Sequence, residues 1–424
     1  MAETIPLRSS QEQGPSCKLH PQSMCPAFGA LRILTRIEGA HPVMATDTGC
    51  LYGLTFVTHF YAARKSILAP AIGTAELLNG QIVESTRATI DVAAREPGCK
   101  LIPVISLCVA ETAGLPEELL PRQVGDAEVV LVRVPAYAIH SHPEAKDVAL
   151  EALLRRLGDW KAERMARTVV IVGEVFPGDQ LIIDATLRKM GIESTIALPG
   201  RSIDDLRRAG RAAVLAPLHP FYKGLIRLFR EHNVPVAGGA PVGISGSYAW
   251  IKAIGSLLDL DQQQVQRVAD EERERAIAIV EQKGLQGACI LVTGYEGTEL
   301  AYARALVEAG ATVPYVSTSI GIDPLVLPDE MWLKAHGTRE IVYRKALEED
   351  VSALDRYAPD FVMGTTPFGA IAKDRGIPAM YFTNQVASRP FFLSSGLDAI
   401  LTFMHNAIKR GPTYRAMYDF FAEG

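Results

Sequence analysis

Residues 168–200 read TVVIVGEVFPGDQLIIDATLRKMGIESTIALPG, and the expected fold class can be worked out from this segment. It begins with the β-branched run 168–172, which predicts a buried strand. Apolar residues at helical spacing then predict a helix over 179–190, which Gly191 ends. A second strand is predicted at 194–198. A strand, a helix and another strand in this order are typical of a parallel sheet covered by helices.

The same alternation recurs along the chain. Further strands are predicted at 101–107, 212–216, 234–237, 288–293, 312–316, 361–363 and 379–382. Further helices are predicted at 221–232, 247–258, 298–308, 341–357 and 368–375. We therefore expect an α/β protein built from three Rossmann-like blocks with parallel sheets.

The domain boundaries follow from the breaks in this pattern. A charged run, DQQQVQRVADEERERAIAIVEQKG at 261–284, predicts a long exposed helix between two blocks. The expected units are a flexible N-terminal arm (1–24), three α/β domains (25–160, 165–284 and 287–395) and a C-terminal helical tail (396–424). The first α/β domain carries the candidate cluster ligands, and the second includes the long helix.

Composition excludes several classes of function. Of the 424 residues, 48% are hydrophobic and 21% are charged, which is the balance of an ordinary globular protein. Lys and Arg number 43 against 48 Asp and Glu, so the net charge is −5. No basic block is present, and nucleic-acid binding is not expected. No apolar run reaches the roughly 20 residues of a membrane span, and residues 1–24 lack an apolar signal core. Both features favour a cytoplasmic protein that is not integral to a membrane.

Common catalytic and nucleotide-binding motifs are absent from the sequence. It contains no G-x-x-x-x-G-K-[ST], no G-x-G-x-x-G after a strand and no G-x-S-x-G. The glycine-rich segments 238–243 and 294–297 are interpreted as strand-to-helix turns rather than phosphate sites. His140, His142 and His219 have no carboxylate or cysteine partner at metal-binding spacing, so we expect satisfied loop histidines.

The cysteines are the most informative residues. Cys25, Cys50 and Cys108 each lie at the predicted end of a strand or start of a helix, where the positive helix end favours a thiolate. Their spacing is too wide for a zinc ribbon or a ferredoxin motif, and three unrelated buried cysteines remain an alternative. An iron–sulfur cubane takes four ligands, so three thiolates suggest an open iron or a cluster shared between subunits. Of the other cysteines, Cys17 is assigned to the N-terminal arm, Cys99 to an exposed turn and Cys289 to a strand core.

Seven short motifs then carry a family resemblance. They are SMCPAFG (23–29), CLYGLTFVTHFY (50–61), ARKS (63–66), LCV (107–109), HPFY (219–222), APVGI (240–244) and AW (249–250). Together they resemble the Y-type subunits of chlorophyllide a reductases, in the family of nitrogenase-like reductases. The resemblance is strong from about residue 23 to about residue 255, and beyond that it is mainly architectural.

The resemblance implies a nitrogenase-component-like fold and a specific activity. Y-type and Z-type subunits would form a heterotetramer with a [4Fe–4S] cluster at each interface, held here by Cys25, Cys50 and Cys108 and by one ligand of the Z-type subunit. A separate ATP-hydrolysing iron protein, the X-type subunit, would deliver electrons. The reaction would reduce the C7=C8 double bond of chlorophyllide a.

The residues leave the proton donor and the pigment contacts open. His59, Glu111 and His219 are the candidate proton donors. Aromatic residues after Cys50 could line a pigment cavity or belong to an ordinary core: Tyr52, Phe56, Phe60 and Tyr61. Alternative functions are the N-type subunit of light-independent protochlorophyllide reductase, a scaffold for cofactor assembly and, more distantly, a nicotinamide dehydrogenase.

Overall fold

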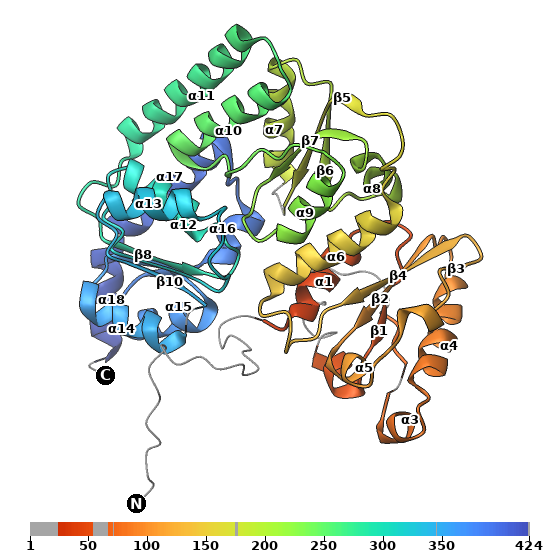
Figure 1. Cartoon of the computed structure of the whole chain (residues 1–424). Helices are drawn as coiled ribbons and strands as arrows, with labels where there is room; N and C mark the ends of the chain where they lie inside the picture. The colour runs from red at the N-terminus through yellow and green to blue at the C-terminus, as the bar shows by residue number, and fades with distance from the viewer. Residues whose placement is uncertain (1–23, 54–66, 71, 174–176, 345, 423–424) are drawn as a thin grey trace, which may run out of the picture.

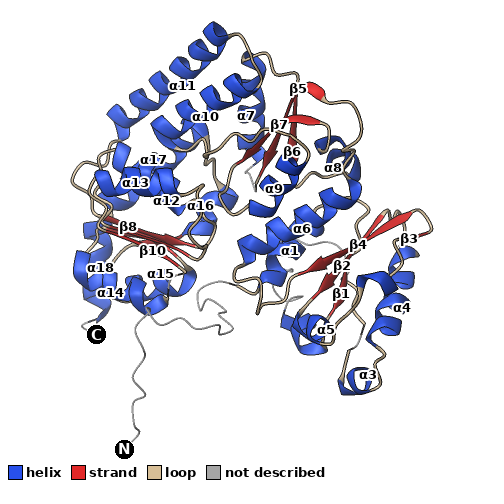
Figure 2. Ribbon diagram, viewed as in Figure 1, coloured by secondary structure: helices blue, strands red, loops and turns tan. Residues whose placement is uncertain are grey.

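The computed structural model describes residues 24–53, 67–70, 72–173, 177–344 and 346–422 of the chain. Its strands form three separate sheets among helices, as Figure 2 shows. Every pair of described strands is parallel except β3 with β4. The expected α/β fold with parallel-sheet blocks is therefore confirmed.

Block one contains a four-stranded sheet in the order β1-β2-β4-β3. Its strand β2 is buried at every position because helices cover both faces. Leu101 and Ile105 pack with α1 and α6 on one face, and Ile102 and Val104 pack with α4 on the other. The elements are α1 (Pro26–Leu34), β1 (Val43–Ala45), α3 (Thr74–Leu78), α4 (Ile82–Ala94), β2 (Leu101–Ser106), α5 (Cys108–Thr112), η1 (Glu117–Leu119), β3 (Gln123–Val124), β4 (Ala127–Arg133) and α6 (His142–Leu157).

Block two contains a three-stranded sheet in the order β6-β5-β7. The strand expected at 234–237 is reduced to a single bridge between Val236 and Leu215. Pro235 lacks an N–H group, so this segment cannot extend the ladder. The elements are β5 (Met165–Val172), α7 (Pro177–Lys189), β6 (Ser194–Leu198), α8 (Ile203–Ala209), β7 (Ala212–Pro217), α9 (Lys223–Glu231), α10 (Gly243–Leu257) and α11 (Gln262–Lys283).

The long charged helix is α11, and it is exposed on one face only. The Asp261 carboxylate caps its start by accepting the N–H groups of Gln263 and Gln264. Val265 and Ala269 lie on its buried face, which packs against α10 and α17. Figure 1 shows these helices side by side at the edge of the molecule.

Block three contains a five-stranded sheet in the order β10-β9-β8-β11-β12. The helix expected over 341–357 is wrong in its first part, where β10 pairs with β9. Arg344, at φ 52°, separates this strand from α14. The elements are β8 (Ile290–Gly294), α12 (Glu299–Glu308), β9 (Tyr315–Thr318), α13 (Leu327–Ala335), β10 (Glu340–Tyr343), α14 (Leu347–Tyr357), β11 (Phe361–Gly364), α15 (Thr366–Lys373), β12 (Ala379–Tyr381) and α16 (Phe382–Ser388).

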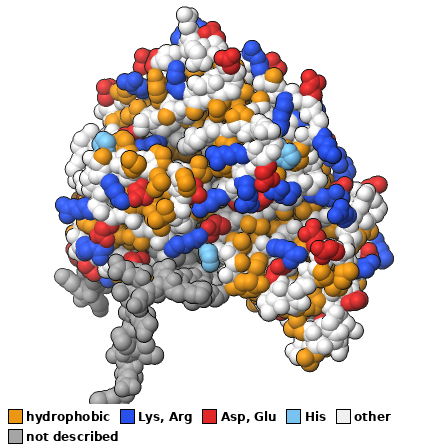
Figure 3. Space-filling view, in the orientation of Figure 1, with side chains coloured by type: hydrophobic (Ala, Val, Ile, Leu, Met, Phe, Trp, Pro, Cys, Tyr) orange, Lys and Arg blue, Asp and Glu red, His pale blue; other side chains and the backbone are white. Residues whose placement is uncertain are grey.

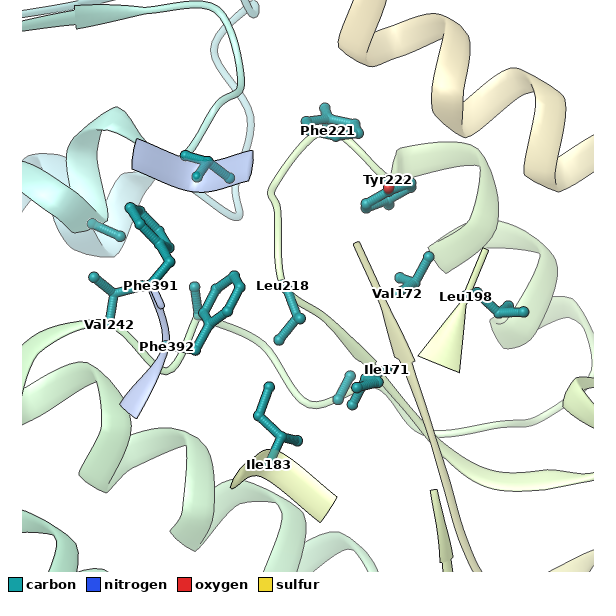
Figure 4. Packing of buried hydrophobic residues seen from close by; sticks show 14 of the residues in the cluster. Ile171, Val172, Ile183, Leu198, Leu218, Phe221, Tyr222, Val242, Phe391 and Phe392 are labelled. Carbon is teal, nitrogen blue, oxygen red and sulfur yellow. The ribbon is translucent and has the colours of Figure 1, made fainter. Parts of the chain in front are cut away.

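The C-terminal helices are α17 (Leu393–Lys409) and α18 (Gly411–Ala422), and α17 returns to block two. Its start is held there by the Glu272 carboxylate of α11, which accepts the Ser394 N–H. The Asp179 carboxylate of α7 accepts the N–H of Phe391 at 3.0 and 3.1 Å. Figure 4 shows Phe391 beside Val242 and Phe392 on the side of Leu218, both residues of block two.

The surface carries charges of both signs. Figure 3 shows Lys and Arg side chains interspersed with Asp and Glu on the face in view. Within the described ranges, no helix combines the length and the apolar character needed to cross a membrane.

Candidate functional site

The three cysteines lie beside helix starts in block one, as the sequence predicts. Cys25 is the N-cap residue of α1, with Pro26 at the first helical position. Cys108 is the first residue of α5, two residues after β2 ends. Cys50 lies in a helical turn shortly after β1, where the Asp47 carboxylate accepts the N–H groups of Gly49 at 2.8 Å and Cys50 at 3.0 Å.

Electrostatic interactions join the three thiols into one neighbourhood. The charge of Cys108 acts on Cys25, and the charge of Cys25 acts on Cys50. Strands β1 and β2 are adjacent and parallel, with Ala45 opposite Ser106, so their carboxyl ends lie at the same sheet edge. Ligands of α/β proteins bind at this type of edge.

Burial opposes ionisation of two of these thiols. It raises the pKa of Cys25 and, together with the hydrogen bond and charge of Asp47, raises the pKa of Cys50. Helix starts are expected to lower the pKa of a nearby thiol, but desolvation of the thiolate has the larger effect on these two cysteines. Iron binding here would therefore release protons as thiolates form.

The three thiols are possible ligands of iron, since cysteine thiolates hold iron–sulfur clusters. Among the described residues, no group of three or more His, Cys, Asp or Glu side chains has the arrangement that holds one metal ion. In a cubane each cysteine binds a different iron, so the thiolates stand further apart than ligands of one ion. Cys50 is exposed, and Cys25 and Cys108 are half-buried, which leaves the site open to a ligand from another chain.

The remaining cysteines occupy other places. Cys99 is half-buried against the block-one core and is less exposed than expected for a turn residue. Cys289 is bridged to Thr312 beside the block-three sheet, and its Sγ donates to the Tyr357 carbonyl at 3.7 Å. Cys17 lies outside the described residues.

The candidate proton donors lie in different parts of the chain, and Glu111 shares helix α5 with Cys108. Glu111 of α5 forms an ion pair with Arg133 at 2.8 Å, which gives it a structural partner. His219 follows β7, is 2% exposed and stacks on Phe221, with ring centroids 5.3 Å apart. His59 lies outside the described residues, as do Phe56, Phe60 and Tyr61. The described aromatic residue of that segment, Tyr52, is 78% exposed.

His219 instead belongs to a junction between blocks. Together with Pro220, Gly297 and Thr298, it lines a cleft where the loops after β7 and β8 meet. A Cβ at Gly297 would lie 3.3 Å from both Pro220 and Phe221, so glycine permits this close approach.

The sequence reasoning missed a buried ionic cluster at the same junction. His142, expected to be a satisfied loop histidine, is the first residue of α6, and its Nε2 lies 3.5 Å from Glu296 Oε1. The other carboxylate oxygen, Glu296 Oε2, binds Lys146 Nζ at 2.9 Å. Burial lowers the pKa of His142. Burial alone would raise the pKa of Glu296, but the Lys146 ammonium holds it well below its usual range. Lys146 and Glu296 are 150 positions apart, so no local pattern could reveal the pair.

Comparisons with known proteins agree with this architecture. The family model of nitrogenase component 1 type oxidoreductases matches residues 25–409. The chlorophyllide reductase 52.5 kDa chain of Rhodobacter capsulatus is 37% identical over 414 residues, covering 95% of this chain and 82% of the relative. A light-independent protochlorophyllide reductase chain from a Methylobacterium species is 28% identical over 374 residues, covering 83% of this chain and 72% of the relative.

The solved structure of nitrogenase Cp1 at pH 6.5 shares the fold, with a TM-score of 0.80 at 19% identity over 96% of this chain and 95% of that chain. The family match spans all three blocks and the three cysteines. The chain therefore belongs to the nitrogenase component 1 type oxidoreductases.

Proposed function

We propose that this chain is the Y-type subunit of a chlorophyllide a reductase and acts in the cytoplasm. The observation that carries the proposal is the 37% identity with a chlorophyllide reductase chain across 95% of this chain. Relatives named for protochlorophyllide reduction are 24 to 28% identical, so the N-type alternative is less supported. A cofactor-assembly scaffold would not need this degree of likeness to a reductase.

In this proposal, Cys25, Cys50 and Cys108 hold three irons of a [4Fe–4S] cluster, and a Z-type subunit supplies the fourth ligand. Support comes from the donor chemistry, the helix starts beside Cys25 and Cys108, and the exposure of Cys50. Such a cluster supplies single electrons when bound. The chain itself orients the thiolates, and Cys25 packs against the main apolar core.

The proposed reaction reduces the C7=C8 double bond of chlorophyllide a by adding two electrons and two protons. The electrons would come one at a time from a separate X-type, ATP-hydrolysing iron protein, because this sequence contains no P-loop of its own. His219 and Glu111 remain candidate proton donors among the described residues.

The test is anaerobic co-purification with a Z-type chain, followed by assay with the iron protein, MgATP, a strong reductant and chlorophyllide a. We expect an iron–sulfur signal in the complex and a product with the bacteriochlorin absorption spectrum. Reduction of protochlorophyllide instead would establish the N-type alternative. A complex that binds iron but reduces neither pigment would favour the scaffold.

A further inference from the structure

Three buried ionisable side chains meet where the blocks join. Lys146, Glu296 and His142 are 0%, 2% and 3% exposed. Lys146 and His142 lie in the first turns of α6, and Glu296 lies in the loop between β8 and α12. We call these three residues the junction cluster. Lysine and glutamate are almost never buried to this degree unless they are paired.

The junction cluster touches all three blocks. Glu296 Oε1 accepts the Thr383 hydroxyl of block three at 3.3 Å. Lys146 Nζ lies 5.7 Å from the centre of the Phe221 ring in block two. The loop that carries Glu296 is itself fixed, because the Glu296 N–H donates to Glu299 Oε1 at 2.8 Å.

The same helix start is also connected to the cysteines. A Cβ at Gly29 of α1 would lie 1.8 Å from the His142 carbonyl oxygen, so α1 and α6 are in direct backbone contact there. Cys25 caps this α1 helix. The Cys108 Sγ accepts the Ala136 N–H at 3.2 Å, and Ala136 belongs to the segment that leads into α6. Any displacement of the α6 start would therefore move the surroundings of both cysteines.

We propose that Lys146, Glu296 and His142 are positioning residues: their buried cluster fixes the cysteine-bearing edge of block one against the loop that follows β8 in block three. The consequence for an iron–sulfur cluster rests on the proposed function, whereas the connection between the blocks does not.

A buried ion pair is suited to this role rather than to adding stability. Desolvation offsets most of the attraction of the pair, but either charge left alone is strongly unfavourable. An arrangement of blocks that separates Lys146 from Glu296 is thus disfavoured, while apolar side chains of equal size tolerate small shifts. The fold therefore gains one defined arrangement.

The test compares four variants of the full chain in complex with its Z-type partner. Lys146→Met/Glu296→Met replaces both charges by apolar side chains, and Glu296→Gln removes only the carboxylate charge that faces Lys146. His142→Phe keeps a ring against Tyr295, whose ring centroid is 4.8 Å away, and removes the contact with Glu296. Leu153→Ala is the matched control, because Leu153 is a core residue of α6 that lies outside the junction cluster.

The readouts are the thermal midpoint, amide hydrogen exchange of residues 141–148 and 294–299, and the electron paramagnetic resonance spectrum of the reduced complex. For the double variant we expect a midpoint within about 2 °C of wild type, because replacing both charges is close to neutral. We also expect at least about tenfold faster exchange in both segments and a changed spectrum. Glu296→Gln should lower the midpoint by roughly 5 °C.

Leu153→Ala should lower the midpoint and keep the wild-type spectrum. Wild-type hydrogen exchange and a wild-type spectrum in the double variant would overturn the proposal. If the double variant does not fold, the same two results in His142→Phe would overturn it. A wild-type complex without any iron–sulfur signal would overturn the proposed function instead, and hydrogen exchange would still decide whether the junction cluster fixes the blocks.

Discussion

The contact between α1 and α6 gives the sharpest prediction of stability. Gly29 is a buried helical residue, and a Cβ there would lie 1.8 Å from the His142 carbonyl oxygen and 2.8 Å from its carbonyl carbon. Both atoms are backbone, so no side chain can rotate away. Gly29→Ala must therefore push the two helices apart by about 1 Å or more, against the packing of Leu31 and Leu34.

The expected cost follows from two opposing effects. Overpacking of a dense core costs about 3 kcal/mol at the upper end of its usual range, and a backbone contact belongs at that end. Alanine gains about 1 kcal/mol over glycine in helix propensity. Gly29→Ala should therefore lower the free energy of unfolding by about 2 kcal/mol.

The matched control is Gly369→Ala in α15, which is also a buried helical glycine. The nearest atom to a Cβ at Gly369 is the Ala379 Cβ at 3.8 Å, which is ordinary contact. Here only the propensity gain remains, so this variant should be more stable by up to about 1 kcal/mol. Urea unfolding followed by far-ultraviolet circular dichroism measures both changes. Equal effects of the two substitutions, or a neutral Gly29→Ala, would refute the packing argument.

Three further predictions concern the thiols, a buried carboxyl group and the source of electrons. Replacing Cys25, Cys50 or Cys108 with serine should remove the cluster signal and turnover, because serine is a poor iron ligand. Cys99→Ser and Cys289→Ser should retain the iron. Iron content and electron paramagnetic resonance measure both outcomes. Burial raises the pKa of Asp147, whose carboxylate accepts the N–H groups of Gly224 and Leu225, to about 7. The folded chain thus holds this proton more tightly than the unfolded chain. The stability that Asp147 contributes should be complete below about pH 4 and should fall by up to about 1.4 kcal/mol per pH unit as the pH rises toward 7. Asp147→Asn should remove that slope, and an unchanged slope in urea titrations would contradict the assignment. Finally, the complex supplied with chlorophyllide a and NADPH alone should be inactive until the iron protein and MgATP are added, as absorption spectra of the pigment would report.

Local sequence patterns predict the repeated elements and the positions of the cysteines. Buried β-branched runs such as 168–172 and the glycine that ends α7 are local signals, and the structure follows them. Cys25 before Pro26 predicts a helix start for the same reason. These features depend only on a few neighbouring residues.

The errors arise where tertiary contacts decide. Residues 340–343 continue an apparently helical pattern, yet pairing with β9 makes them a strand. The Pro235 segment has a strand composition but cannot supply the N–H groups of a ladder. The junction cluster was missed because its partners come from distant parts of the chain, and a single sequence contains no sign of such a pairing.

Carboxylates of the chain itself occupy several helix starts near the junctions of the blocks, and this bears on where a negatively charged group could bind. In block two, Asp147 of α6 accepts the first N–H groups of α9, and Glu308 of α12 accepts those of α10. In block three, the carboxylate of Glu299, the first residue of α12, accepts the Glu296 N–H in the turn after β8, where a nucleotide-binding block would hold phosphate. A phosphate at these three starts would have to displace a carboxylate of the chain itself. The starts of α1 and α5 have no side-chain cap of this kind and carry Cys25 and Cys108 instead. The starts of α1 and α5 are thus among the positive helix ends of the described chain that no carboxylate occupies, which agrees with the role proposed for Cys25 and Cys108.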